Sequence, residues 1–315
     1  MKFILLGAAT LSFSLLAQQP KLTRAGVEGM MKELSNWGRW GKDDQSGAVH
    51  LITPAVRKAA AALVKDGVSI SLSRKLDTEK ALDNGAPFGS KPIRDGDFAM
   101  DEYTVSYHGF AHTHMDALGH MSVAGKGFNG FPAPAAGKGL DRLSIGNYKD
   151  GIFTRGVLID LPRLKGVKYL EPGTAIYPAD LDAWEKSTGI RIGPGDAVLI
   201  RTGRWARRAE KGPWAAQDTM AGLNASCARW LKQRDIAIFA SEGPGDVLPS
   251  GIDGVAWPLH QLLLIAMGVP MLDNCDFEEL TQTATSRNRF TFLLSVAPLR
   301  VDSGTGAPVN PVATF

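Results

Sequence analysis

The sequence contains only two cysteines, Cys227 and Cys275, among its 315 residues. Two cysteines this far apart do not make a disulfide scaffold, so any disulfide is optional and stability must come from a packed core. An excess of one charge is also lacking, because 35 Lys and Arg residues face 32 Asp and Glu residues, for a net charge of +3. This balance argues against binding to nucleic acid or to a membrane surface.

Other absences narrow the class of protein further. The sequence has no internal repeat and no low-complexity tract, which excludes solenoids and propellers. The glycine-rich stretch from Gly189 to Gly195 has neither the spacing of a dinucleotide fingerprint nor the Lys-Ser/Thr ending of a phosphate-binding loop. The Ser-Glu-Gly sequence at 241–243 is not a nucleophile elbow. These patterns therefore indicate neither a nucleotide-binding enzyme nor a serine hydrolase.

The start of the chain has the layout of a secretory signal. A single Lys precedes an apolar run from Phe3 to Ala17, and polar residues follow at 18–19. The run is too short to span a bilayer, which needs about 20 apolar residues, and it lacks the polar face of a surface helix. We therefore expect residues 1–17 to be a signal peptide and the protein to be exported, to the periplasm or outside the cell.

Strands and helices alternate along the rest of the chain. Thr53 and Pro54 are typical of a helix start, so a helix is expected over 53–65, followed by a half-buried strand at 68–72 and a loop at 81–98. Further strands are expected at 156–161, 197–202, 236–240 and 290–298, and further helices at 178–187, 221–233 and 259–267. This alternation predicts a mixed α/β fold, and because no linker interrupts it, we expect residues 18–315 to form a single domain.

Four of the six histidines lie close together, at His108, His112, His114 and His120, and Asp116 lies among them. Neutral imidazole and carboxylate groups are the usual protein ligands of zinc, manganese and iron. This density of ligand groups in a chain otherwise poor in histidine predicts a metal site.

Spacing ranks the candidate ligands. In a strand, the period of two places His112, His114 and Asp116 on one face, with neighbours roughly 7 Å apart. His108 would lie about 20 Å from His114 on a straight strand, and it reaches the site only if the chain bends, for example at Gly109. Strand parity therefore favours His112 as the first ligand, with His108 as the alternative.

Two more histidine positions fit the same site. His120 follows the expected strand after a turn near Asp116, so we expect it to lean over the site. His260 opens an apolar helix just after Pro258, where its ring is free to point outward. We expect His260 to be a further ligand.

The segment His-Thr-His-Met-Asp-Ala-Leu-Gly-His, residues 112–120, resembles the cyclase family of metal-dependent hydrolases. This family includes bacterial kynurenine formamidases, isatin hydrolases and polyketide cyclase-like proteins, with the signature HxGTHxDxxxH. His114, Asp116 and His120 occupy the last three functional positions of that signature. Its first His is Phe110 here and its usual Gly is His112, so the identity of the first ligand stays open between His112 and His108.

The resemblance extends over nearly the whole chain after the signal. Segments 40–44 and 308–311 resemble the opening and closing segments of one branch of the family, and 258–260 with 268–274 resembles its late motif. The late motif implies that His260 and Asp273 complete the metal site, with Asp273 at a position where Glu is common.

The resemblance implies a β-rich α/β fold of the swivelling β/β/α type: an open, barrel-like mixed sheet with helices packed on it, assembled as homodimers or homotetramers. It also implies one or two zinc or manganese ions and a small aromatic substrate. The expected reaction is hydrolysis of an amide, formamide, lactam or lactone by a metal-activated water, with His120 as the acid–base residue. Trp40 and Trp257 are candidates for the walls of the substrate pocket. The alternatives are a polyketide-type cyclase or dehydratase and a non-catalytic metal- or ligand-binding protein.

Overall fold

The structure, a computed structural model, describes residues 22–315. The expected signal peptide and its cleavage site lie outside the described residues. Within the described part of the chain, no helix is long and apolar enough to cross a membrane. Both cysteines are buried and neither forms a disulfide.

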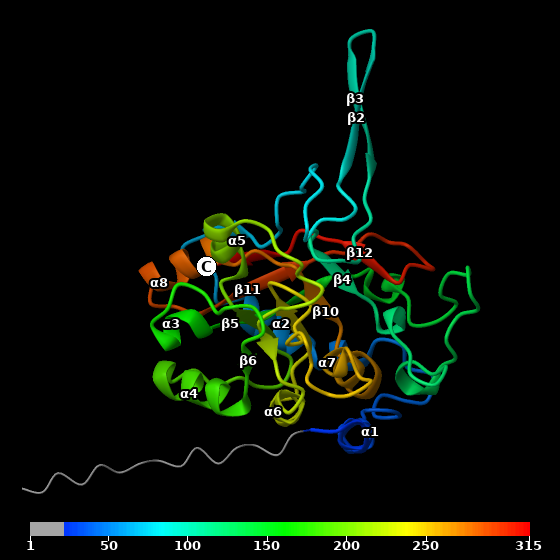
Figure 1. Cartoon of the computed structure of the whole chain (residues 1–315), viewed down its shortest axis with the longest axis vertical. Helices are drawn as coiled ribbons and strands as arrows, with labels where there is room; N and C mark the ends of the chain where they lie inside the picture. Colours follow the sequence, from blue (N-terminus) through cyan, green and yellow to red (C-terminus); the bar gives the residue numbers. More distant parts are fainter. Residues whose placement is uncertain (1–21) are drawn as a thin grey trace, which may run out of the picture.

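Nine strands form one mixed sheet in the order β1-β13-β11-β5-β7-β9-β10-β4-β12. Their bounds are Ser69–Ser71 for β1, Val312–Thr314 for β13, Thr291–Val296 for β11, Ile152–Asp160 for β5, Ala197–Arg201 for β7, Ile238–Ser241 for β9, Met271–Asp273 for β10, His114–Asp116 for β4 and Gly306–Pro308 for β12. Strands β5, β7, β9 and β10 run parallel, and the remaining pairs are antiparallel. The sheet curls into a half-barrel, which confirms the expected β-rich α/β fold (Figure 1).

Helices pack on this sheet. They are α1 (Arg24–Glu33), α2 (Pro54–Ala61), α3 (Leu161–Lys165), α4 (Pro178–Thr188), α5 (Arg204–Lys211), α6 (Cys227–Gln233), α7 (Pro258–His260) and α8 (Glu278–Ser286), with short 3-10 helices η1 (Gly47–Leu51), η2 (Leu118–His120), η3 (Phe128–Gly130) and η4 (Ile145–Tyr148) and a π-helix η5 (Gln261–Met267). Helix α2 packs on β5 and β11, while α3 contacts β7 and α4 contacts β5. All five residues of β7 are buried, as expected for a parallel strand that is covered on both faces.

Most of the expected elements are present, and two expectations were wrong. The segment 81–98 was expected to be a loop, but Gly89–Asp95 forms strand β2, which pairs with β3 (Phe98–Thr104) across a tight turn at Gly96. The helix expected over 221–233 begins only at Cys227, because Gly222–Leu223 pairs as strand β8 with β6 (Ala175–Ile176). In both places pairing with another segment overrode the local composition.

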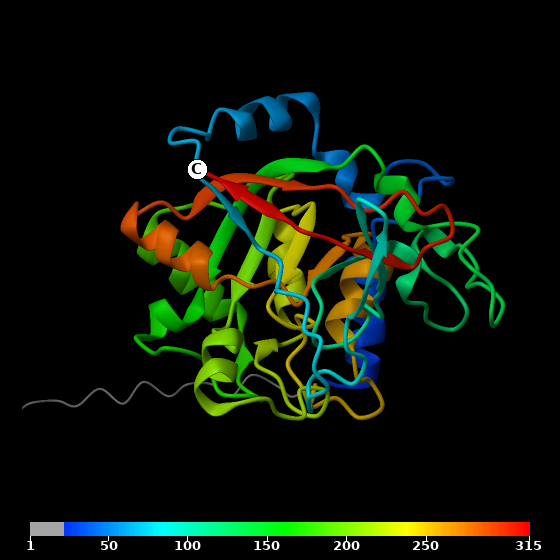
Figure 2. The same ribbon diagram turned by 90° about the horizontal axis from the view of Figure 1, so that it is seen from above.

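The hairpin of β2 and β3, residues 89–104, stands away from the rest of the chain and is called the arm below (Figure 1). In the view from above, the arm points toward the reader (Figure 2). Every residue of the arm is exposed except Ile93, which is half-buried. Ile93, Phe98 and Met100 lie on the same face, because Ile93 pairs with Met100 and Asp95 with Phe98. The arm thus carries apolar side chains on a face that the single chain leaves uncovered.

The parallel strands bring their carboxyl ends to one edge of the sheet. Asp273 is the last residue of β10 at this edge. Strand β4 runs antiparallel to β10, so its first residue, His114, lies opposite Asp273. The carboxyl edge of parallel strands is where α/β proteins usually bind their ligands, and the histidine cluster lies there.

Candidate metal centre

Asp116 lies at the middle of the cluster. Strand β4 places His114 and Asp116 on one face of the sheet, as their spacing of two predicts. The Nε2 atom of His114 lies 3.5 Å from Asp116 Oδ1. Both side chains are buried, and the neighbouring strand adds the buried carboxylate of Asp273 across from His114. Two carboxylates and an imidazole are therefore held together on strands far apart in sequence.

His108, rather than His112, is the other histidine from this segment that reaches Asp116. The Nδ1 atom of His108 lies 3.2 Å from Asp116 Oδ1, and its Nε2 is 2.9 Å from the hydroxyl of Thr305. His112 points elsewhere, with Nε2 at 3.1 Å from the carbonyl oxygen of Ala86. The preference for His112 is corrected here, because β4 begins only at His114 and residues 108–112 form a series of bends, so strand parity does not apply to them.

His120 and His260 approach Asp116 from the other side. The Nε2 atoms of His120 and His260 lie 3.9 Å and 3.8 Å from Asp116 Oδ2. His260 Nε2 is also 3.5 Å from Asp273 Oδ2. The ring of His120 stacks on that of His108, with centroids 4.1 Å apart, and both rings are partly exposed. The buried residues thus form the floor of the cluster, and these two rings form its open side.

The cluster fits a divalent metal ion. Both oxygens of Asp116, Oδ1 of Asp273 and Nδ1 of His108 are buried and have no hydrogen-bond partner. Buried polar atoms without a partner are costly, and a cation would satisfy all of them. Two sets of three residues could each hold an ion, because within each set the ligand atoms lie within 4.8 Å of one another. One set is His108, Asp116 and His120, and the other is His114, Asp116 and Asp273. Asp116 belongs to both sets, so the arrangement suits one ion or two ions that share this carboxylate.

The ionisation of these groups follows from their surroundings. Burial alone would raise the pKa of Asp116, but His114, His120 and the other rings around it hold that pKa well below its usual value. Burial lowers the pKa of His120, which favours the neutral ring that a base requires. Burial would also lower the pKa of His260, yet Asp246 and Asp273 raise it above its usual value. The carboxylates at the centre thus attract positive charge.

Asp246 supports His260 and was not predicted as a functional residue. Its Oδ2 atom lies 2.6 Å from His260 Nδ1, and its Oδ1 accepts a hydrogen bond from the backbone N–H of Leu259 at 2.7 Å. Asp246 therefore caps the start of α7 and turns Nε2 of His260 toward the cluster. A carboxylate behind a ligating histidine is the usual way to orient the ring. No local pattern marks this role, because Leu259 lies thirteen positions after Asp246 in the sequence.

A cavity of about 250 Å³ opens onto the cluster, with Phe110, Met121, Pro244 and Trp257 in its walls. The rings of Phe110 and Trp257 are 6.3 Å apart and face the histidines as an aromatic side. Trp257 thus lies where a pocket wall was expected. Trp40 does not line this cavity, because it stacks on His50.

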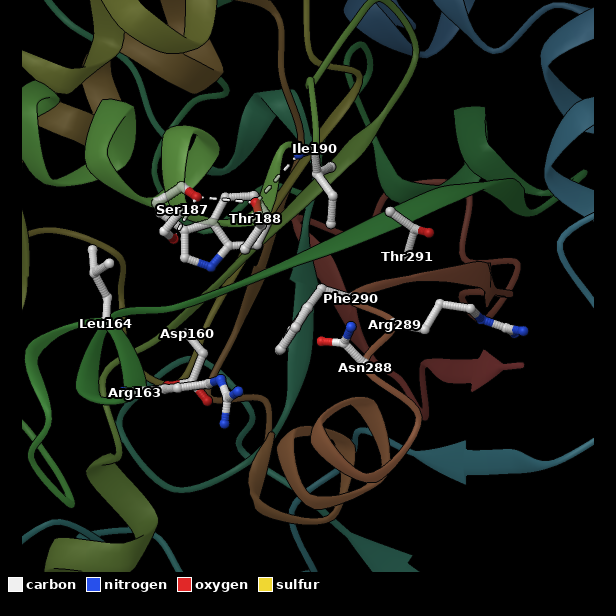
Figure 3. A pocket seen from close by; sticks show the side chains of 11 residues that line it. Asp160, Arg163, Leu164, Ser187, Thr188, Ile190, Asn288, Arg289, Phe290 and Thr291 are labelled. Atoms are coloured by element: carbon white, nitrogen blue, oxygen red, sulfur yellow. Dashed lines mark hydrogen bonds between the residues drawn. The ribbon is translucent and has the colours of Figure 1, made fainter.

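A larger cavity of about 590 Å³ lies elsewhere, between Trp184, Phe290 and Arg163 (Figure 3). No histidine lines it, and its one carboxylate, Asp160, already accepts hydrogen bonds from the Arg163 N–H and from Arg201. Asp160 has no free oxygen for a metal because the Thr281 hydroxyl donates to it as well. The chemistry of the donor atoms, rather than the size of the cavity, therefore identifies the candidate site.

Comparison with known proteins gives one family match. The family described as "Putative cyclase" matches residues 42–245. None of the curated proteins matches the chain.

Solved structures of similar proteins share the fold. A crystal structure described as a novel cyclase is 29% identical, with a TM-score of 0.81, and the match covers 90% of this chain and 99% of that one. Isatin hydrolase A from Labrenzia aggregata is 20% identical with a TM-score of 0.57, covering 82% of this chain and 96% of that one. Isatin hydrolase A from Ralstonia solanacearum is 23% identical with a TM-score of 0.56, covering 83% and 97%. At the identity of the two isatin hydrolases, the likeness concerns the fold alone.

Proposed function

We propose that this chain, which belongs to the cyclase family, is a metal-dependent hydrolase of a small amide, formamide, lactam or lactone. The observation that carries the proposal is the cluster of buried, unpartnered ligand atoms around Asp116 at the foot of an aromatic-walled cavity. Under this proposal His108, His114, Asp116, His260 and Asp273 hold one or two divalent ions, with zinc or manganese favoured by the mixture of imidazole and carboxylate groups.

The residues around the cluster have distinct tasks in such a reaction. A bound divalent ion would lower the pKa of a coordinated water and polarise the scissile carbonyl group. His120, whose ring is partly exposed to the cavity, takes the proton from the water and returns it to the leaving group. Asp246 keeps His260 in one orientation throughout, because it holds Nδ1 of that ring. Phe110 and Trp257 exclude water from one side of the substrate and favour a flat ring there.

The size of the cavity supports a small substrate. At about 250 Å³ it lies below the usual range of ~300–1,000 Å³ for ligand pockets. Isatin hydrolases of this fold act on a cyclic amide with an aromatic ring, as their name states. A kynurenine formamidase-like or isatin-like substrate therefore fits the cavity and its aromatic wall better than a long or charged one.

The proposal is tested by assaying the purified protein with Zn²⁺ or Mn²⁺ against N-formylkynurenine, isatin and a simple lactone. We expect metal-dependent turnover of at least one of them, with a product that has gained one water. A product of unchanged mass, or one that has lost water, would instead support the cyclase or dehydratase alternative. Stoichiometric metal without turnover of any compound would support a non-catalytic binding protein.

We also propose that the chain forms a homodimer or homotetramer in which the arm packs on a second copy. An isolated two-stranded hairpin is at best marginally stable in water, and this one exposes Phe98 and Met100. In a two-fold interface each chain contributes its arm and also receives its partner's arm. The 16 residues of the arm fall short of the roughly 20–30 residues a side of a stable interface, so the surface that receives the partner's arm supplies the rest.

The double substitution Phe98→Asp with Met100→Asp is expected to convert the oligomer to a monomer in sedimentation velocity, because it replaces two exposed apolar side chains of the arm with charged ones. Ala99→Asp is the matched control, since Ala99 pairs with Arg94 on the opposite face of the same hairpin. An unchanged sedimentation coefficient of the double variant would contradict the role of the arm.

A further inference from the structure

The segment that leads from His108 to His114 is held from behind by Asn274. The Nδ2 group of Asn274 donates hydrogen bonds to the carbonyl oxygens of Gly109, at 2.7 Å, and His112, at 3.2 Å. Its backbone oxygen accepts a hydrogen bond from the Thr113 hydroxyl at 2.8 Å. Asn274 is completely buried, so its hydrogen bonds to the bends at 108–112 lie inside the protein.

Arg204 fixes Asn274 and the same bends together. Its Nη1 donates to Asn274 Oδ1 at 2.7 Å and to the carbonyl oxygen of Glu242 at 2.8 Å. Its Nη2 donates to the carbonyl oxygen of Phe110. Burial lowers the pKa of Arg204 to about 10, which still leaves the group charged at neutral pH. One planar guanidinium thus joins the residue after β9, the residue after β10 and the bends at 108–112.

The position of Arg204 is itself fixed by Glu242. Glu242 Oε2 accepts hydrogen bonds from the backbone N–H groups of Thr202 and Gly203, both at 2.7 Å, and of Arg204 at 3.3 Å. These N–H groups lie at the start of α5, where helices leave donors without partners. The side chain of Arg204, the first residue of α5, therefore points into the interior in a fixed direction.

The network ends on a ligand of the metal centre. The carbonyl oxygen of His112 accepts from Asn274 Nδ2 and also lies 2.8 Å from Nδ1 of His114. An Nδ1–H that donates to this oxygen leaves the lone pair of Nε2 directed at the cluster, 3.5 Å from Asp116. The backbone oxygen of His112 thus determines the tautomer of His114, and Asn274 holds that oxygen in place.

We propose that Asn274 and Arg204 are positioning residues of the metal centre, which place His108 and His114 around Asp116 and select the tautomer of His114. The proposal rests on the proposed metal-dependent function. The site would then consist of side chains that touch the metal and of the buried pair Asn274 and Arg204, which determines where those side chains point. Neither residue contacts the cavity.

Asn274→Asp tests the proposal with little change in shape. An aspartate keeps the acceptor for Arg204 and tolerates the positive φ of 55°, but it replaces the Nδ2 donor with an oxygen that faces two carbonyl oxygens. We expect the affinity for Zn²⁺, measured by competition with a chelating dye, to fall by ~10–100-fold, the range for partners behind metal ligands.

Asn36→Asp is the matched control. Asn36 is also buried, its Nδ2 donates to the carbonyl oxygen of Met267 at 2.8 Å and its Oδ1 accepts from Arg39, but it lies outside the cluster. We expect Asn36→Asp to keep the wild-type affinity for Zn²⁺ even where its melting temperature falls. A loss of affinity as large in Asn36→Asp as in Asn274→Asp would show that general destabilisation is responsible, and would overturn the proposal.

A second measurement does not depend on metal or on turnover. Nitrogen-15 spectra of the imidazole rings report which nitrogen of His114 carries the proton. We expect Nδ1–H in the metal-free wild type and in Asn36→Asp, and a mixture with Nε2–H in Asn274→Asp. Wild-type tautomer and wild-type Zn²⁺ affinity in Asn274→Asp would overturn the proposal, whereas absent hydrolysis by a wild-type protein that binds Zn²⁺ would contradict only the proposed function.

Discussion

His114→Ala is expected to lose bound metal and activity together, whereas His120→Ala is expected to keep the metal and to slow turnover by ~10²–10⁴-fold. The reason is their different placement. His114 is buried, and its Nδ1 is tied to the backbone. His120 lies farther from Asp116, at 3.9 Å instead of 3.5 Å, and its ring reaches the cavity. His114 is therefore placed as a ligand, and His120 as an acid–base residue.

Metal content by elemental analysis and kcat from the substrate assay separate the two outcomes. His50→Ala is the control, because His50 lies outside the cluster, where its Nε2 is 2.6 Å from Asp44 Oδ1. This variant should retain both metal and turnover. Equal loss of metal from His114→Ala and His120→Ala would show that His120 is a ligand as well, as its place in one of the two ligand sets allows.

Addition of Zn²⁺ or Mn²⁺ to the metal-free protein is expected to raise its melting temperature by roughly 5–10 °C. A ligand at a thousand times its Kd stabilises the folded state by about 4 kcal/mol when it does not bind the unfolded chain, and each kcal/mol shifts the melting temperature of a large domain by about 2 °C. His260 and Asp273 come from elements far from the segment 108–116, so the unfolded chain does not hold the full set of ligands together.

Differential scanning fluorimetry measures this shift, with Mg²⁺ as the control because that ion prefers oxygen ligands and retains its waters. Protons compete with the metal for His260, whose pKa Asp246 and Asp273 raise above its usual value, so the shift in melting temperature should shrink as the pH falls and grow as the pH rises. An equal shift with Mg²⁺, or none with any ion, would contradict an imidazole-rich metal centre.

The parts of the site that the sequence predicts are those that depend on local spacing. His114, Asp116 and His120 belong to one short motif, and the family that the motif resembles is confirmed. Asp273 could be named only through that resemblance, because the pairing of β4 with β10 that places it opposite His114 is not readable from either segment alone. The preference for His112 over His108 was wrong, because the period of a strand was applied to residues 108–112, which form bends.

The fold shows the same division between local and long-range information. Apolar runs predicted β5, β7 and β11 to within a few residues, because their buried pattern is local. The arm was missed because glycine, proline and aspartate in 81–98 are typical of loops, and its strands are stabilised by each other instead of by a core. Arg204 and Asn274 carry no local signal, since the partners through which they act lie 38 or more residues away.

The C-terminal segment determines when the sheet can be completed during synthesis. Strand β12 pairs with β4, Thr305 just ahead of it bonds to His108, and β13 fills the gap between β1 and β11. A nascent chain that still lacks residues 306–315 therefore has no β12 beside β4 and no β13 between β1 and β11. Domains generally fold from their N-terminus during synthesis. Here, however, β1 pairs with β13, so the first strand of the sheet must wait for the last one. The frame around β4 is consequently completed only when residues 306–315 have been synthesised.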